Sequence, residues 1–268
     1  VTIVAAEDKR INQDILIPYN LDLNAKEGQV VEVEITTQPS LREKPMGKII
    51  KILGDYSDSG IEIEIALRKH HLPYDFSKEA LNQANIYGSE IDAKEISGRV
   101  DLRKLPLVTI DGETARDFDD AVYAEPSKNG WRLVVAIADV SAYVKSGTEL
   151  DKEALERGNS VYFPRRVIPM LPESLSNGLC SLNPNVDRLC MVCDMEIDSL
   201  GEVESYKFYP SVMRSKARLT YTIVDEILNK QNATLATKYN DIHDDIKNLH
   251  KIFQLLFNQR KKRGALEF

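Results

Sequence analysis

The stretch that decides the fold of this protein is residues 105–123, which read Leu-Pro-Leu-Val-Thr-Ile-Asp-Gly-Glu-Thr-Ala-Arg-Asp-Phe-Asp-Asp-Ala-Val-Tyr. An apolar run at 105–110 leads into a loop that contains four aspartates, and apolar residues return at Val122 and Tyr123. Short apolar runs bounded by turn residues are typical of buried strands. We therefore predict two strands joined by an acidic loop.

Downstream of this loop, strand and helix signals alternate. A turn at 127–130 precedes the apolar run 131–140, which predicts a hairpin with the strand at Val122. The other expected elements are a helix over 150–156, a long proline-rich loop over 162–184, strands over 190–197 and 203–213, and an amphipathic helix over 240–263. This order predicts a mixed α/β domain.

Upstream, the first 70 residues read as short strands separated by turn residues. The expected strands are 1–6, 14–18, 29–36, 47–53 and 61–67. In the last of these, isoleucine and glutamate alternate from Ile61 to Ile65, which is the period of a half-buried strand. Five strands in about 70 residues favour a small barrel of the oligonucleotide-binding (OB) type. Another small β-barrel or an edge-rich sandwich remains an alternative.

The domain organisation follows from these patterns. We predict a barrel domain over 1–72, a linker with a short helix over 73–100, and a second domain over 101–268. The helix of the linker is expected at 78–85. The predicted fold class is therefore β-rich α+β.

Composition limits the kind of protein. The chain has 268 residues, of which 43% are hydrophobic and 29% charged, as in ordinary globular domains. It contains no run of the roughly 18 to 20 uncharged apolar residues that a membrane-spanning helix needs. Three cysteines, an odd number, fit a reducing compartment better than a disulfide framework. We expect a cytoplasmic protein without disulfides and without a membrane partner.

The four aspartates of the loop have the spacing D-x5-D-x-D-D and are Asp111, Asp117, Asp119 and Asp120. Carboxylates this close raise one another's pKa unless a cation compensates them. Mg²⁺ and Mn²⁺ prefer such oxygen ligands, and a pair of ions roughly 3.5 to 4 Å apart can assist phosphodiester hydrolysis. The loop therefore predicts a site for Mg²⁺, or for Mn²⁺.

Three other interpretations of the loop are possible. A calcium loop of the EF-hand type fails because Gly112 and Ala115 fall at the wrong positions. An aspartyl-phosphate phosphatase would need Asp117 at the end of a strand, and the preceding residues do not resemble a strand. A solvated acidic turn remains open. The net charge of −7 argues against a polyanionic partner unless metal ions offset the charge of the site.

The spacing Cys190-x-x-Cys193 suggests zinc or redox chemistry at first sight. On a strand, residues three apart point to opposite faces, so the two sulfurs could not readily bind one ion. Cys180 stands alone. We predict that all three are structural thiols.

Residues 105–113 and 115–123 resemble the start of the catalytic domain, the RNB domain, of the ribonuclease II family. The resemblance continues through Ser-Val-Tyr-Phe-Pro at 160–164 and through 167–173, 175–184 and 186–193. It covers nearly all of 100–228, and residues 14–73 are similar to a cold-shock domain of that family. Relatives continue beyond residue 268, so we expect a fragment with the first half of the catalytic domain.

The resemblance implies Mg²⁺-dependent hydrolysis of single-stranded RNA from its 3′ end, with release of nucleoside 5′-monophosphates. It implies that Asp111, Asp117 and Asp120 contact the metal ions directly or through water. Asp119 would place the second metal or the attacking water. Residues expected to contact RNA are Tyr162, which would stack on the 3′-terminal nucleotide, Tyr221, Arg116 and Arg165. Arg166 and Arg188 are further candidates for a phosphate contact, and arginines that are merely solvated remain the alternative.

Two alternatives stay open at this stage. Tyr162 could simply pack beneath the proline-rich loop. The chain as it stands could also be an inactive RNA-binding fragment that acts through its barrel. The resemblance implies a monomeric whole enzyme, whereas a fragment with an exposed core could self-associate.

Overall fold

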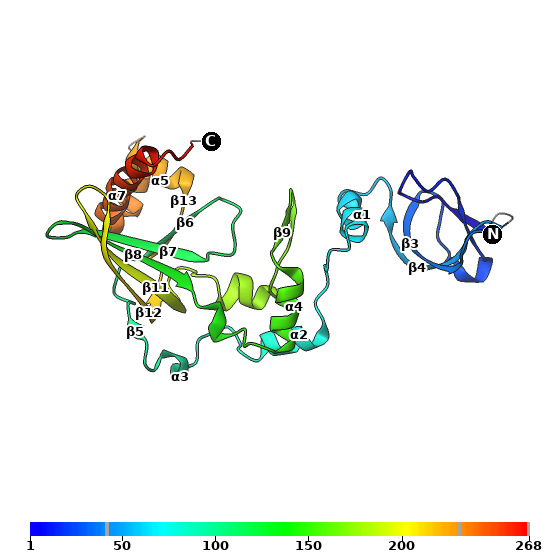
Figure 1. Ribbon diagram of the computed structural model, residues 1–268, viewed down its shortest axis with the longest axis horizontal. Coiled ribbons are helices and arrows are strands. Elements are labelled where there is room, and N and C mark those ends of the chain that lie inside the picture. The colour runs from blue at the N-terminus through cyan, green and yellow to red at the C-terminus, as the bar shows by residue number, and fades with distance from the viewer. Residues whose placement is uncertain (41–42, 230–231, 267–268) are drawn as a thin grey trace. The chain divides into compact units, whose positions relative to one another are not determined.

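The structure is a computed structural model that describes residues 1–40, 43–229 and 232–266. It divides into two compact units, Val1–Tyr74 and Asp75–Phe268 (Figure 1). Over the described ranges, none of the helices combines the length and the apolar composition needed to cross a membrane. The β-rich α+β class predicted from the sequence is confirmed.

The smaller unit is a curved sheet with one helix. Its elements are β1 (Thr2–Val4), β2 (Ile15–Ile17), β3 (Gln29–Thr37), β4 (Met46–Asp55), a short 3₁₀ turn (Tyr19–Leu21) and α1 (Ile61–Lys69). The strand order is β1-β2-β4-β3, and the antiparallel β3–β4 pair has three register shifts. Such irregularities bend a strand and increase its twist. Gly47 is needed in this pair, because a Cβ there would lie 2.6 Å from a methyl carbon of Val33.

The predicted fifth strand at 61–67 is wrong, because this segment is the helix α1. Glu62 and Glu64 lie in its first turn, where negative charge favours a helix. Arg68 donates to the Glu64 carboxylate at 2.6 Å and to that of Glu32, on β3, at 3.0 Å. Leu67 is fully buried. The negative charge at the start of the helix and the burial of Leu67 therefore outweigh the alternating pattern. The described part of this unit has four strands.

The larger unit is built on a sheet with the strand order β13-β6-β7-β8-β11-β12-β5. The strands are β5 (Val100–Asp101), β6 (Val108–Asp111), β7 (Asp120–Pro126), β8 (Gly130–Ala138), β11 (Asp187–Asp198), β12 (Val203–Arg214) and β13 (Ala217–Thr220). The predicted hairpin at 122–140 is confirmed, since β7 and β8 pair antiparallel from Asp120–Ile137 to Pro126–Trp131. The short outer strands β5 and β13 pair in parallel with β12 and β6.

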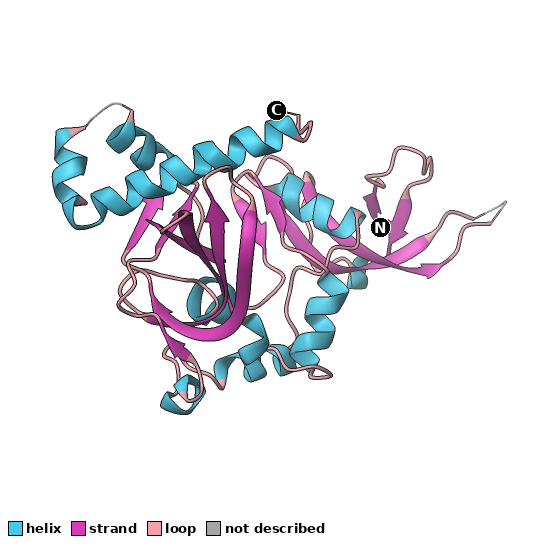
Figure 2. Ribbon diagram, turned by 60° about the vertical axis from the view of Figure 1, so that its left-hand side comes forward, coloured by secondary structure: helices cyan, strands magenta, loops and turns pink. Residues whose placement is uncertain are grey.

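The helices of this unit are α2 (Lys78–Asn85), α3 (Ala93–Ile96), α4 (Glu149–Arg157), α5 (Tyr221–Leu228), α6 (Ala233–Lys238) and α7 (His243–Lys262), with 3₁₀ turns at Val140–Ala142 and Asn240–Ile242. The long helix α7 lies across one face of the curved sheet and packs against β7 (Figure 2). Its buried Ile252 contacts a small cluster with Ala124 and Ile197. The predicted helix at 240–263 is confirmed, whereas β13, α5 and α6 were not expected.

The segment expected to be a proline-rich loop is more ordered than predicted. It contains a separate two-stranded hairpin, β9 (Val161–Phe163) with β10 (Arg166–Ile168), and a π-helical turn, η3 (Ser174–Leu179). The expectation of a long loop over 162–184 was therefore wrong.

The stretch 73–100, expected to be a linker, is packed from Asp75 onward into the larger unit. The helix predicted at 78–85 is confirmed as α2, and its Ala80 and Ala84 are fully buried in the main core. The Ser77 hydroxyl caps this helix and also donates to the Glu153 carboxylate of α4 at 2.7 Å.

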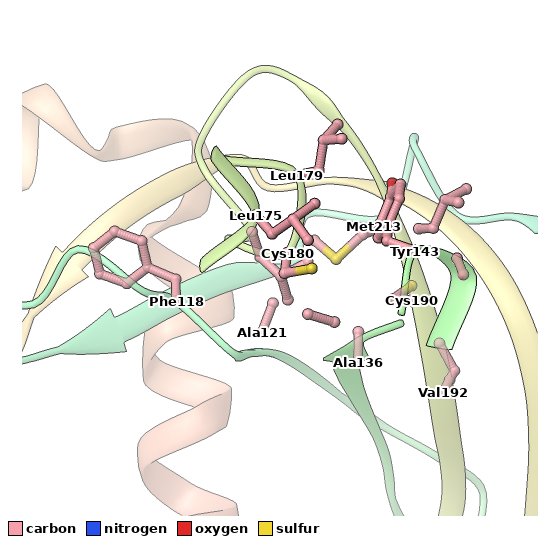
Figure 3. Close-up of a cluster of buried hydrophobic side chains, with 14 of the residues drawn as sticks. Phe118, Ala121, Ala136, Tyr143, Leu175, Leu179, Cys180, Cys190, Val192 and Met213 are labelled. Atoms are coloured by element: carbon pink, nitrogen blue, oxygen red, sulfur yellow. The ribbon is translucent and has the colours of Figure 1, made fainter. Parts of the chain in front are cut away.

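The main core of the larger unit gathers apolar side chains from the sheet, α2, α4 and η3. Figure 3 shows part of this cluster, including Phe118, Cys180 and Cys190. Burial raises the pKa of both thiols to about 12. Cys193, three residues along β11 from Cys190, is only partly buried, and all three cysteines are free. Cys180 and Cys190 are thus core side chains, and a purely structural role for all three thiols stays a prediction.

Candidate active site

The four aspartates lie where strands β6 and β7 separate. Asp111 is the last residue of β6, and Asp120 is the first residue of β7. The two strands pair only at Val108 and Val122, so the chain between the two aspartates forms an open loop. This loop carries Asp117 and Asp119 and is held between two strands of the central sheet.

The carboxylates of this loop affect one another electrostatically. The pKa of Asp119 is raised, chiefly because surrounding protein displaces water from part of the side chain, and then by the charges of Asp117, Asp120 and Asp111. The pKa of Asp120 is raised by the same desolvation and by Asp111. The four side chains therefore share one negative field, which a bound cation would neutralise.

Carboxylate oxygens are the donors that Mg²⁺ and Mn²⁺ prefer, so the chemistry of the loop fits a hard divalent ion. In the part of the chain that the structure describes, however, no three acidic, histidine or cysteine side chains converge tightly enough to form a ready metal site. Mutual repulsion between carboxylates opposes such convergence. The four aspartates thus lie on and beside one loop, but their carboxylate oxygens do not converge on a single metal position.

Tyr162 reaches this loop from β9. Its side chain is 65% exposed, and its hydroxyl donates to a carboxylate oxygen of Asp117 at 3.0 Å. Across the hairpin it pairs with Val167 of β10. The ring is therefore not packed beneath the proline-rich segment, and the residue is largely exposed beside the acidic loop.

Tyr221 lies at the same end of the paired strands β6 and β13 as Asp111. Thr220, the residue before it, is the register partner of Asp111 in the parallel β6–β13 pair and caps helix α5. Tyr221 is the first residue of that helix, and its side chain is 66% exposed. The two aromatic candidates thus come from different elements, β9 and α5.

The arginine candidates differ from one another. Arg116 within the acidic loop, and Arg165 and Arg166 in and beside the turn of the β9–β10 hairpin, are exposed. Arg188 is buried, and its Nε donates to the carbonyls of Gly178 and Ser181. Arg188 is therefore not a suitable candidate for a phosphate contact, because its guanidinium is part of the protein interior.

Three further residues hold the acidic loop and were not predicted. Arg218 donates to the Ala115 carbonyl at 2.9 Å and stacks on the Phe118 ring with 4.6 Å to the centroid. Thr222 donates to the Glu113 carboxylate, and the Ser181 hydroxyl accepts a hydrogen bond from the amide of Phe118, the residue after Asp117. These partners are 63 to 109 positions away in sequence, so no local pattern could have identified them.

Comparison with known proteins fits this fold and this loop. The family model of the RNB domain matches residues 99–268, and that of a cold shock domain matches residues 3–77. The chain therefore belongs to the RNB-domain family, as its resemblance to the ribonuclease II family predicted.

Among curated relatives, the chain is similar to the proteins named Ribonuclease R of Vibrio cholerae, at 53% identity over 266 residues, and Escherichia coli, at 51% over 269. The expectation, from residues 160–193, of greatest similarity to bacterial ribonuclease R agrees with these matches. They cover 99% and 100% of this chain but 32% and 33% of the relatives, so the chain spans about a third of their length.

Solved structures agree with this assignment. The structure of Mycoplasma genitalium RNase R in complex with double-stranded RNA superimposes with a TM-score of 0.85 at 30% identity, over 96% of this chain and 46% of that one. The complex of the same protein with ribose-methylated single-stranded RNA gives a TM-score of 0.83, over 94% and 39%.

Proposed function

We propose that this chain is part of a 3′-to-5′ exoribonuclease that hydrolyses single-stranded RNA and releases nucleoside 5′-monophosphates. The single observation that supports this most is the group of four aspartates at the facing ends of β6 and β7 and on the loop between them, inside the segment matched by the RNB domain. Relatives named Ribonuclease R, about three times as long as this chain, share the whole segment.

In this proposal, Asp111, Asp117 and Asp120 hold Mg²⁺, or Mn²⁺, directly or through water. Such ions stabilise the attacking and leaving oxygens of an in-line displacement and lower the pKa of a bound water. Asp119, whose pKa is raised by its surroundings and by the other three carboxylates, orients the water or completes the second metal position. The loop's role is to collect carboxylate oxygens where a phosphodiester can approach.

RNA would be bound by stacking and by charge. The exposed ring of Tyr162 beside Asp117 is suited to stack on the 3′-terminal base, and stacking tolerates any sequence. Tyr221 would contact the same strand from α5. Arg116 and Arg165 would contact phosphates, which offsets the acidic character of the loop.

The test is a shortening assay. The purified chain is incubated with 5′-labelled single-stranded RNA and Mg²⁺, and products are separated at nucleotide resolution. Stepwise shortening that disappears in Asp119→Asn and persists in Asp244→Asn, which alters an exposed aspartate of α7, is expected. Shortening that persists in Asp119→Asn would contradict the assignment of the loop.

A second candidate function is RNA binding without hydrolysis, through the smaller unit. The match of residues 3–77 to a cold shock domain favours it, as do the exposed rings of Tyr19 and Tyr56 in that unit. RNA binding without any shortening in the same assay would support this alternative. Loss of that binding in Tyr19→Ala with Tyr56→Ala would assign it to the smaller unit.

The proposal includes a cellular setting and an assembly state. The three free cysteines suit the reducing conditions of the cytoplasm, where we place the protein.

The whole enzyme would be monomeric. This chain could self-associate through exposed apolar side chains such as Tyr206 and Phe208 on β12, whose rings lie 5.4 Å apart. Light scattering over a concentration series would measure that association.

A further inference from the structure

Ser181 is a fully buried serine whose hydroxyl contacts the acidic loop on both sides of Asp117. The hydroxyl donates to the carbonyl of Arg116 at 3.0 Å, and it accepts from the amide of Phe118 at 3.0 Å. Arg116 and Phe118 are the two neighbours of Asp117 in the chain. One side chain thus bonds the peptide groups that precede and follow this aspartate.

A third hydrogen bond and a buried ring complete this attachment. The amide of Leu182 donates to the carbonyl of Phe118 at 2.9 Å. The Phe118 ring is buried in the main core (Figure 3), whereas Asp117 is only half-buried. The backbone at 116–118 is therefore tied to the interior, while the carboxylate of Asp117 remains accessible.

Ser181 is itself held by buried groups. The Nε of Arg188 donates to the Ser181 carbonyl at 2.9 Å and to the Gly178 carbonyl at 3.1 Å. The Ser181 amide donates to the same Gly178 carbonyl at 3.2 Å. A hydroxyl in this setting has little freedom to turn away, so it can impose a fixed position on its partners.

We propose that Ser181 is a positioning residue that sets where the Asp117 carboxylate is presented to a divalent cation. This inference rests on the proposed metal site of the aspartate loop. Removing the hydroxyl leaves a buried amide without its acceptor and a carbonyl without its donor, so the loop must shift to find water. Partners that orient metal ligands typically change metal affinity or activity by about 10- to 100-fold when removed.

The experiment compares Ser181→Ala with Ser211→Ala in the complete chain. Ser211 is a matched control, because it is also fully buried and donates one hydrogen bond to a backbone carbonyl, that of Val100, at 2.6 Å. It lies on β12, separated from β6 by three strands of the sheet. Ser181→Thr keeps the hydroxyl and serves as the rescue variant.

Two quantities are measured below the thermal transition of every variant. Amide hydrogen exchange reports the Phe118 amide, and the electron paramagnetic resonance signal of free Mn²⁺ reports the dissociation constant for that ion. In Ser181→Ala we expect exchange to accelerate at 116–118 and Mn²⁺ affinity to fall by about 10-fold. In Ser211→Ala both should stay within about twofold of the original chain, and Ser181→Thr should restore both.

Unchanged exchange at Phe118 and unchanged Mn²⁺ affinity in Ser181→Ala would overturn the inference and leave the proposed function intact. Equal losses in both alanine variants would also overturn it, since they would reflect general destabilisation. If the unsubstituted chain bound no Mn²⁺ at all, the proposed metal site would fail, and the inference with it. If Ser181→Thr does not fold, the amide exchange at Phe118 and the Mn²⁺ affinity of Ser181→Ala still test the inference.

Discussion

At the residue scale, Tyr162 joins two features that usually belong to different side chains. Its ring is exposed and free to stack, while its hydroxyl donates to the Asp117 carboxylate. Desolvation and this hydrogen bond raise the pKa of Tyr162, so the phenol stays protonated and remains a donor at neutral pH. Base stacking and contact with the carboxylate can be separated by substitution.

Tyr162→Ala should weaken the binding of single-stranded RNA by about 5- to 150-fold, which corresponds to the roughly 1 to 3 kcal/mol that stacking contributes per base. Tyr162→Phe keeps the ring and should stay within about twofold. Fluorescence anisotropy in EDTA, where RNA is not consumed, measures both. Tyr206→Ala, which removes a similarly exposed ring from β12, is the control, and an equal loss there would refute a specific role for Tyr162.

At the element scale, a polar network joins the four neighbouring strands β7, β8, β11 and β12. Arg132 of β8 makes two parallel bonds to Asp194 of β11, at 2.9 and 2.8 Å, and a third to Glu125 of β7 at 2.9 Å. Tyr209 of β12 donates to Asp194 at 2.9 Å. The hydrogen bond from Arg132 is the largest cause that lowers the pKa of Asp194, against the opposing effect of burial.

This lowered pKa predicts a pH dependence of stability. Because the carboxyl of Asp194 has a lower pKa folded than unfolded, where it is about 4, its stabilising contribution is complete above pH 4. The contribution disappears as the pH falls through the folded-state value. Asp194→Asn should cost about 1 to 3 kcal/mol at pH 7, and the loss should shrink on acidification.

Chemical denaturation at pH 7 and at several values below 4 measures this difference. Asp244→Asn is the control, because Asp244 is almost fully exposed and its Lys247 partner lies 3.5 Å away. Exposed pairs of this kind contribute about 0 to 1 kcal/mol. A pH-independent loss in Asp194→Asn would show that the charge of Asp194 does not matter.

At the scale of the whole molecule, a net charge of −7 has to be reconciled with the proposed binding of a polyanion. The reconciliation we propose is local, with cations at the aspartate loop and exposed arginines beside it. Single-stranded nucleic acids release about 0.7 counterion for each phosphate that a protein neutralises. The salt dependence of the RNA affinity therefore reports how many phosphates the protein contacts.

RNA affinity should fall as salt rises, and Arg165→Ala should reduce the slope of log K against log salt by about 0.7. Lys247→Ala, which removes a partly exposed cation from α7, should leave the slope unchanged. Binding isotherms between roughly 50 and 200 mM salt give these slopes. Equal slopes for the original chain and Arg165→Ala would exclude a phosphate contact by Arg165.

Removal of divalent ions should separate hydrolysis from binding. With EDTA, stepwise shortening of RNA should stop, because the carboxylate loop then lacks the cations that a phosphodiester displacement needs. Part of the RNA affinity should remain, since stacking on Tyr162 needs no metal. Restoring Mg²⁺ should restore shortening, and shortening that continues in EDTA would contradict a metal-dependent site.

Much of this protein could be predicted from local sequence. The β7–β8 hairpin, α2, α4 and α7 follow from periodicity and turn residues, which act over a few positions. The spacing of the four aspartates between two apolar runs located the candidate site and carried the resemblance to its family. Each of these signals lies in a short segment whose preferred conformation agrees with the final fold.

Contacts between segments far apart in the sequence determine the features that local patterns do not predict. Ile61–Lys69 alternates like a strand yet is helical, because Leu67 is buried and Arg68 bonds Glu32 from another element. The supports of the acidic loop, Ser181 and Arg218, come from segments 63 to 105 positions away. Hydrogen bonds and burial between segments so far apart form only when the chain is folded, so no local pattern in the sequence can report them.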